Sequence, residues 1–181
     1  QKVYFENCHS ISSSTPILSA SAWHGNPWSD CFVCLLLTSG KNGDMFAQGN
    51  QKVTTEMLTK HFVSSSCDSL KDKPKLFFVQ IYDDSEEAAS QDASLYDMTI
   101  PAEFDFFLAY DVSRRSNSGR KSNLVQAVDS LLRDTVAPYQ AVELQDIMRK
   151  AARMTSQTST TSCCMSTLRK RVIFSVKQLV H

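Results

Sequence analysis

Apolar residues occur along this chain in short blocks whose spacing alternates between that of strands and that of helices. Unbroken apolar runs at residues 31–38 and 76–82 predict buried strands, the first of them covered on both faces, and residues 104–112 predict a third strand. Helical spacing appears at 54–62, with Thr54 as the N-cap, and again at 123–136 and 141–154. The alternation predicts an α/β fold, a sandwich whose mostly parallel sheet carries helices on both faces.

The remaining segments give weaker patterns. Residues 2–5 alternate as a strand does, and residues 15–23 predict a short helix with Pro16 in its first turn. A serine- and arginine-rich loop is expected at 113–122 and a mobile loop at 155–166. Residues 167–176 are β-branched and predict the final strand.

The composition changes sharply at residues 83–99, which are rich in Asp, Glu, Ser, Ala and Gln. Such a segment buries little apolar surface, so it is expected to be an exposed linker. It divides one domain into a first part, residues 1–82, and a second part, residues 100–181.

Composition excludes several classes of protein. Lys and Arg total 19 and Asp and Glu total 19, so no net charge favours nucleic acid or an anionic membrane. The longest apolar run, at residues 31–37, is far shorter than the roughly 20 residues that span a bilayer, and no signal-peptide pattern precedes it. The 6 cysteines are too sparse for a disulfide scaffold, which favours a reducing cytoplasm.

Three segments carry a resemblance to a known family. They are Asp30-Cys-Phe-Val-Cys-Leu-Leu-Leu-Thr-Ser-Gly40, Lys73-Pro-Lys-Leu-Phe-Phe-Val-Gln-Ile-Tyr82 and Ile100-Pro-Ala-Glu-Phe-Asp-Phe-Phe-Leu-Ala-Tyr110. In order and spacing they resemble the large subunit, linker and small subunit of caspases. The resemblance implies the caspase-like three-layer sandwich, with the family's first strand lying before Gln1. The run Phe174-Ser-Val-Lys-Gln178 is similar to insect effector caspases.

The resemblance also places the family's catalytic residues. Caspases carry a histidine where this chain has Ser39 and a nucleophilic cysteine where it has Tyr82. A cysteine protease needs a thiolate and an imidazole, because these groups titrate near neutral pH, whereas tyrosine ionises near pH 10. Gly40 and Asp83 are what remains of the oxyanion region, in which acidic residues replace the family's Arg-Gly. The chain is therefore expected to be a pseudoenzyme without cofactor or metal.

Two residues match the family's aspartate pocket, Gln80 and Arg120. They mark either a residual aspartate-binding site or relics of ancestry without a ligand. Cys31 and Cys34 have the spacing of half a zinc site, but on a buried strand they are expected to be core residues.

Caspases pair through their last strands across a two-fold axis. In this chain that strand is predicted to include Arg171, Val172, Ile173, Phe174 and Val176. The resemblance implies heterodimerisation with an active caspase in apoptosis, which would stabilise the partner's active conformation. A dominant-negative inhibitor, a homodimeric scaffold and a weak hydrolase stay open. Asp84 and Asp92 are predicted sites at which a partner caspase cuts the linker.

Overall fold

A computed structural model of the chain describes residues 30–41, 44–46, 51–83, 99–114, 123–136, 140–155 and 161–175. The predicted elements at residues 2–5 and 15–23, and the linker at 84–98, lie outside these ranges. None of the helices in the described ranges is long and apolar enough to cross a bilayer.

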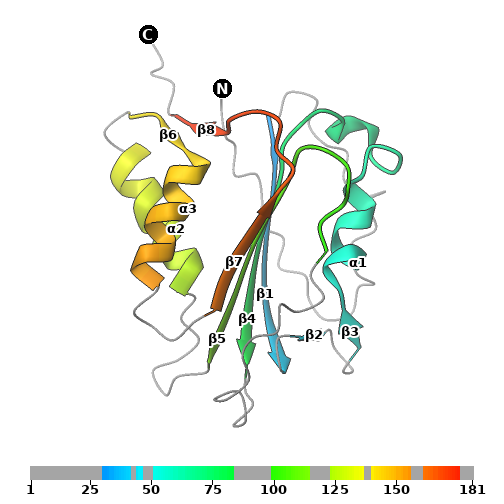
Figure 1. The fold of residues 1–181 in the computed structure, drawn as a ribbon, viewed down its shortest axis with the longest axis horizontal. Helices are drawn as coiled ribbons and strands as arrows, with labels where there is room; N and C mark the ends of the chain where they lie inside the picture. The colour runs from blue at the N-terminus through cyan, green and yellow to red at the C-terminus, as the bar shows by residue number, and fades with distance from the viewer. Residues whose placement is uncertain are drawn as a thin grey trace.

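A mixed sheet of 6 strands forms the centre of the molecule (Figure 1). Its three long central strands, β1, β4 and β5, run parallel, and the outer strands run antiparallel to their neighbours. In the order in which they lie across the sheet, the strands are β3 (Lys52–Val53), β2 (Asp44–Phe46), β1 (Phe32–Lys41), β4 (Lys75–Asp83), β5 (Phe106–Arg114) and β7 (Thr161–Ser166).

Helices cover both faces of this sheet, as Figure 1 shows. On one face lie α1 (Thr55–Thr59) and the 3₁₀ turns η2 (Lys60–Phe62) and η3 (Asp68–Leu70); on the other lie α2 (Asn123–Val136) and α3 (Leu144–Thr155). The first core centres on packed rings, among them Phe32, Phe62 and Phe77. The second joins Leu124 and Ile147 to the opposite face of β4 and β5. The predicted three-layer α/β fold is confirmed.

Local signals placed most of these elements correctly. Thr54 caps α1 by accepting a hydrogen bond from the Met57 N–H at 3.1 Å, as its hydroxyl predicted. The bounds of α2 agree with the predicted helix. The helix α3 begins later than expected, because Val142–Glu143 form a short strand, β6, before it. Strands β4 and β5 extend through Asp83 and Arg114, so they take in residues that the sequence assigned to the linker and the loop.

The C-terminal predictions need correction. Residues 161–166, expected in a mobile loop, form β7 and pair with β5 from Phe107↔Ser166 to Val112↔Thr161. The expected long final strand contains only β8 (Ile173–Phe174), which pairs with β6 in a separate two-stranded sheet. Phe174 is buried in the α2 and α3 core, and Arg171 binds Glu143 by an ion pair. Residues 171–174 therefore do not lie along the edge of the main sheet, and Val176 lies outside the described residues.

Strand β1 also departs from its expected burial on both faces. Leu35 is 44% exposed and Leu37 is 53% exposed, although their neighbours Cys34 and Leu36 pack against the ring core. The reason is that α2 and α3 cover the faces of β4 and β5, so that on this face of β1 only Val33 packs against their core.

Candidate functional site

Ser39 and Tyr82, which the resemblance aligns with the family's catalytic positions, stand side by side at the carboxyl ends of parallel strands. Ser39 of β1 is in register with Tyr82 of β4, and Tyr82 is in register with Ser113 of β5. Residues directly opposite each other in a sheet point to the same face, so these three side chains share one face. Tyr82 is only 5% exposed and Ser113 only 2% exposed, so the space beside Ser39 is filled by protein.

Gly40 follows Ser39 at a point where two strands meet closely. A Cβ atom added there would lie 2.3 Å from the Asp44 carbonyl oxygen and 2.3 Å from Ile81 Cγ2. No side chain fits such a gap, so packing alone requires glycine at this position. Its backbone pairs with Asp83, which ends β4. The assignment of Gly40 and Asp83 to an oxyanion region stays a prediction.

A buried polar row crosses the sheet one step below Tyr82. Gln80 is fully buried, and its amide nitrogen donates to the Ser113 hydroxyl at 3.0 Å and to the Asp111 carbonyl at 3.3 Å. Asp111 lies opposite both Gln80 and Ser162, and the Ser162 hydroxyl donates to its carboxylate. Thus Gln80 contacts its neighbours in the sheet. Arg120, its predicted partner in an aspartate pocket, lies outside the described residues, as do Asp84 and Asp92.

Asp111 is the most unusual member of this row. Its side chain is fully buried, and one carboxylate oxygen, Oδ2, has no hydrogen-bond partner within the described structure. Burial raises the pKa of Asp111, while hydrogen bonds from Ser162 and Gln80 oppose the shift. An ionised Asp111 carboxylate would repel a second carboxylate bound beside Gln80, such as that of an aspartate ligand. Sequence reasoning missed Asp111, although an aspartate inside the apolar run 104–112 was a visible signal.

Where the pKa of a described cysteine is shifted, it is shifted upward, which disfavours the reactive thiolate. Burial raises the pKa of Cys34 to about 11, and it also raises the pKa of Cys31 and Cys164. Reactive cysteines have the opposite shift, because the thiolate is the nucleophile. Cys34 packs against the ring core, as expected for a core residue. Among the residues that the structure describes, His, Cys, Asp and Glu side chains form no group of three or more that could hold a metal.

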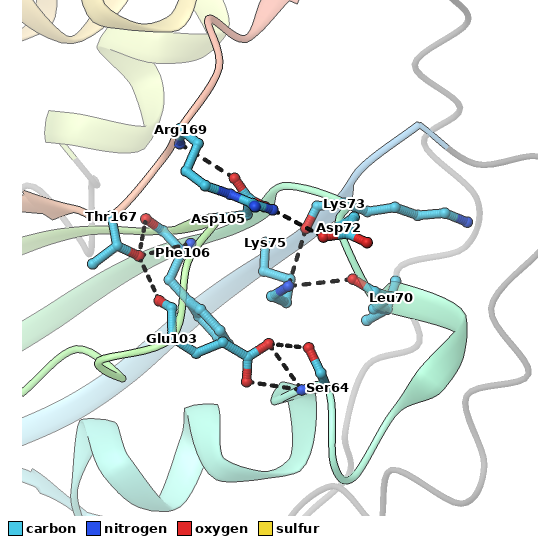
Figure 2. Close-up of polar contacts among 10 residues, drawn as sticks. All are labelled: Ser64, Leu70, Asp72, Lys73, Lys75, Glu103, Asp105, Phe106, Thr167 and Arg169. Atoms are coloured by element: carbon cyan, nitrogen blue, oxygen red, sulfur yellow. Dashed lines mark hydrogen bonds and ion pairs between the residues drawn. The ribbon is translucent and has the colours of Figure 1, made fainter.

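A second polar cluster lies at the opposite ends of β4 and β5, and Figure 2 shows its contacts. Arg169 donates to the buried carboxylate of Asp105 and, at 2.9 Å, to Asp72. Both aspartates have the left-handed backbone that Asp tolerates, with φ of 71° and 57°. The hydrogen bonds from Arg169 lower the pKa of Asp105, with an opposing contribution from burial.

The same cluster holds a buried lysine. Lys75 is 1% exposed, and its Nζ donates to the Leu70 and Lys73 carbonyls at 3.2 and 3.1 Å. Burial lowers the pKa of Lys75, and the Glu103 and Asp105 carboxylates oppose that change. Glu103 in turn accepts the Ser64 N–H at 2.9 Å. The contacts of Glu103 with Ser64 and of Arg169 with Asp72 join the first part of the chain to the second, so the cluster is a structural tie between the two.

The fold and this geometry agree with what comparison with known proteins finds. A family model described as the caspase domain matches residues 7–173. Relatives include Caspase-8 of Rattus norvegicus, 32% identical over 95 residues, which cover 44% of this chain and 20% of the relative. They also include Caspase-7 of Gallus gallus, which is 32% identical over 149 residues. That match covers 73% of this chain and 48% of the relative. The chain belongs to the caspase family.

Solved structures give the same fold. Caspase-1 from Spodoptera frugiperda matches with a TM-score of 0.62 and 22% identity, covering 83% of this chain and 65% of that one. A structure described as pro-sf-caspase-1 matches with a TM-score of 0.65 and 24% identity. The match covers 84% of this chain and 67% of that one. The chain spans between about a fifth and a half of the length of the curated relatives named above.

Proposed function

We propose that this chain is a catalytically inactive member of the caspase family that regulates an active caspase by pairing with it. In this role the chain contributes a surface and no chemistry. The observation that carries the proposal is the pair Ser39 and Tyr82, in register at adjacent strand ends where the family has its histidine and cysteine.

The chemistry of these two residues supports inactivity. A serine hydroxyl is no proton shuttle at neutral pH, and a tyrosine phenol ionises only near pH 10. Loss of either member of a nucleophile and base pair costs several orders of magnitude in rate. The buried ring of Tyr82 also occupies space that a substrate carbonyl would need. The raised pKa values of Cys31, Cys34 and Cys164 argue against a relocated nucleophile.

The surface proposed for pairing is the outer edge of β7, which no strand among the described residues occupies. It replaces the residues 171–176 that the sequence suggested, because β7 is the last strand of the main sheet. A partner that binds only the active conformer of a caspase raises the population of that conformer. Activation of the partner is thus the favoured direction, and the same contact would inhibit if it trapped an inactive conformer.

Three further features bear on this assignment. Tyrosine at the cysteine position is shared with the long form of the FLICE-like inhibitory protein, which this chain resembles in that respect. The sequence at residues 174–178 is the basis for proposing an insect lineage. The free thiols of the described cysteines suit a reducing compartment, for which we propose the cytoplasm.

The test is a titration of this protein into a caspase held at a low, mostly monomeric concentration, with cleavage of an aspartyl peptide as the readout. We expect a saturable rise in rate and no turnover by this chain alone. The matched control is Cys164→Lys, which puts a charge on the β7 edge and should abolish the effect. A saturable fall would establish an inhibitor, and turnover by this chain alone would overturn the pseudoenzyme assignment.

A further inference from the structure

Asp111 lies where β5 meets the edge strand β7. Its side chain is fully buried, whereas Ser162, the residue directly opposite it on β7, is exposed. The Ser162 hydroxyl donates to one oxygen of the Asp111 carboxylate, and the other oxygen, Oδ2, has no hydrogen-bond partner among the described residues. An ionised carboxylate in this position is unfavourable, because a buried charge that is only partly hydrogen-bonded has lost its hydration without full replacement.

The described groups around Asp111 do not include a cation that offsets its charge. On its face of the sheet, the titratable side chains of β4 and β7 are Tyr82 and Cys164, and neither residue type can become positive. The buried residues of α2 and α3 on this face are apolar: Leu124, Ala127, Leu144, Ile147, Met148 and Ala151. The ion pairs described on these helices are exposed and join Arg133 to Asp129 and Arg149 to Asp146. Burial raises the pKa of Asp111, and the hydrogen bonds from Ser162 and Gln80 only oppose that shift.

On one side of Asp111 only the edge strand β7 continues the sheet. β7 pairs with β5 along its inner side, and no strand among the described residues pairs with its outer side. Ser162 is the second residue of β7, so the contact with Asp111 lies where the strand begins. Strand ends open more readily than strand centres. Movement of the first β7 residues away from β5 would therefore bring water to the Asp111 carboxylate.

The two protonation states of Asp111 thus favour different states of β7. The neutral carboxyl costs far less to bury than the carboxylate, so it favours the paired strand. The carboxylate gains hydration when the first residues of β7 move away, so it favours the open strand. In the open state Asp111 has its ordinary pKa near 4, and in the paired state burial raises it. Opening therefore becomes easier as the pH rises above about 4, until Asp111 is ionised in the paired state as well.

We propose that Asp111 is a proton-dependent latch on β7: the protonated side chain holds the first residues of β7 on the sheet, and the ionised side chain releases them. The outer edge of β7 is the surface of the proposed function, so the latch would regulate that surface. Pairing with a caspase would be tighter when Asp111 is protonated and weaker when it is ionised. The regulation of pairing rests on the proposed function, whereas the latch itself does not.

Hydrogen exchange followed by mass spectrometry tests the latch in the full chain without a partner. Wild type and Asp111→Asn are compared at the same pH, so that the intrinsic pH dependence of amide exchange cancels. We expect the exchange rate of residues 161–166 in the wild type, divided by that in Asp111→Asn, to rise with pH by at most about tenfold per pH unit, because one group titrates. In low concentrations of urea this rise should not change, because a local opening exposes little surface.

Two further variants control the comparison. Asp134 also accepts a serine hydroxyl, that of Ser130, but it is exposed, so Asp134→Asn should exchange in β7 as the wild type does at every pH. Ser162→Ala keeps the Asp111 carboxylate and removes a hydrogen bond that lowers its pKa. Exchange in Ser162→Ala, relative to the wild type, should therefore keep rising above the pH at which the wild type levels off. This comparison decides the question if Asp111→Asn does not fold, which circular dichroism checks.

A β7 exchange ratio that stays constant with pH overturns the latch, and so does a rise that appears only with the urea dependence of global unfolding. The caspase titration, repeated at the lowest and highest pH of the series at which the caspase is active, tests the regulation. The wild type should need a higher concentration for its half-maximal effect at the higher pH, and Asp111→Asn should change less. An unchanged wild-type value contradicts the regulation. No effect on the caspase at either pH, with the exchange result as expected, overturns the proposed function and leaves the latch.

Discussion

Single residues at the strand ends contribute to packing and to hydrogen bonds within the sheet. Tyr82, at the position that the resemblance aligns with the family's nucleophile, has a buried ring. One row below, the amide of Gln80, which the resemblance aligns with the family's aspartate pocket, is bonded to Ser113 and to the Asp111 backbone. The amide nitrogen of Gln80 is therefore bonded within the sheet, which favours a structural role for Gln80, whereas Asp111 Oδ2 in the same row has no partner among the described residues.

Asp111 gives a prediction of pH dependence. An aspartate whose folded pKa lies above its unfolded value of about 4 favours folding fully below pH 4, and this contribution is lost as the pH rises through the folded pKa. Asp111→Asn removes the titration and keeps an oxygen that accepts from Ser162. We expect the unfolding free energy of the wild type, measured by urea denaturation, to fall relative to that of Asp111→Asn as the pH rises above about 4. If the unfolding free energy of the wild type minus that of Asp111→Asn stayed constant or rose with pH, the pKa of Asp111 would not be raised in the folded protein.

At the scale of elements, patterns with strong local signals were predicted well and the C-terminal region was not. The buried runs that became β1 and β4, the Thr54 cap and the α2 pattern depend on the local sequence alone. Strand β7 has few apolar residues, and its strand structure comes from hydrogen bonds to β5. Conversely, residues 171–174 have the composition of a strand, yet tertiary packing of Phe174 against α2 and α3 limits them to β8. The polar row was missed because its members come from β4, β5 and β7.

Helix α3 provides a matched test of this packing. Ile147 is 1% exposed and belongs to the core beneath α2 and α3, whereas Met154 on the same helix is 50% exposed. We expect Ile147→Ala to lower the unfolding free energy by about 2 to 4 kcal/mol, because it leaves a cavity. Met154→Ala should change it by less than about 0.5 kcal/mol. Equal losses in urea denaturation would contradict the assignment of α3 to the sheet face.

At the scale of the whole molecule, the linker divides the sequence but not the folded structure. Strand β4 from the first part pairs with β5 from the second over nine positions, from Lys75↔Phe106 to Asp83↔Arg114. The cluster in Figure 2 adds Arg169 with Asp72, and Glu103 with Ser64, across the same division. An exposed ion pair contributes little by itself, so the strand pairing and the shared cores dominate.

This arrangement predicts that cutting the linker leaves one particle. Incubation with an active caspase should give fragments whose intact masses correspond to cleavage after Asp84 or Asp92, and an Asp84→Ala, Asp92→Ala variant should stay whole. The two fragments should elute together in gel filtration and separate only in urea. After cleavage, the fragments of the Arg169→Gln variant should separate at a lower urea concentration than those of the Lys170→Gln variant. Only Arg169→Gln leaves the buried Asp105 carboxylate without its donor. Separate elution in native buffer would contradict a shared fold, and absence of fragments would rule out the two linker sites.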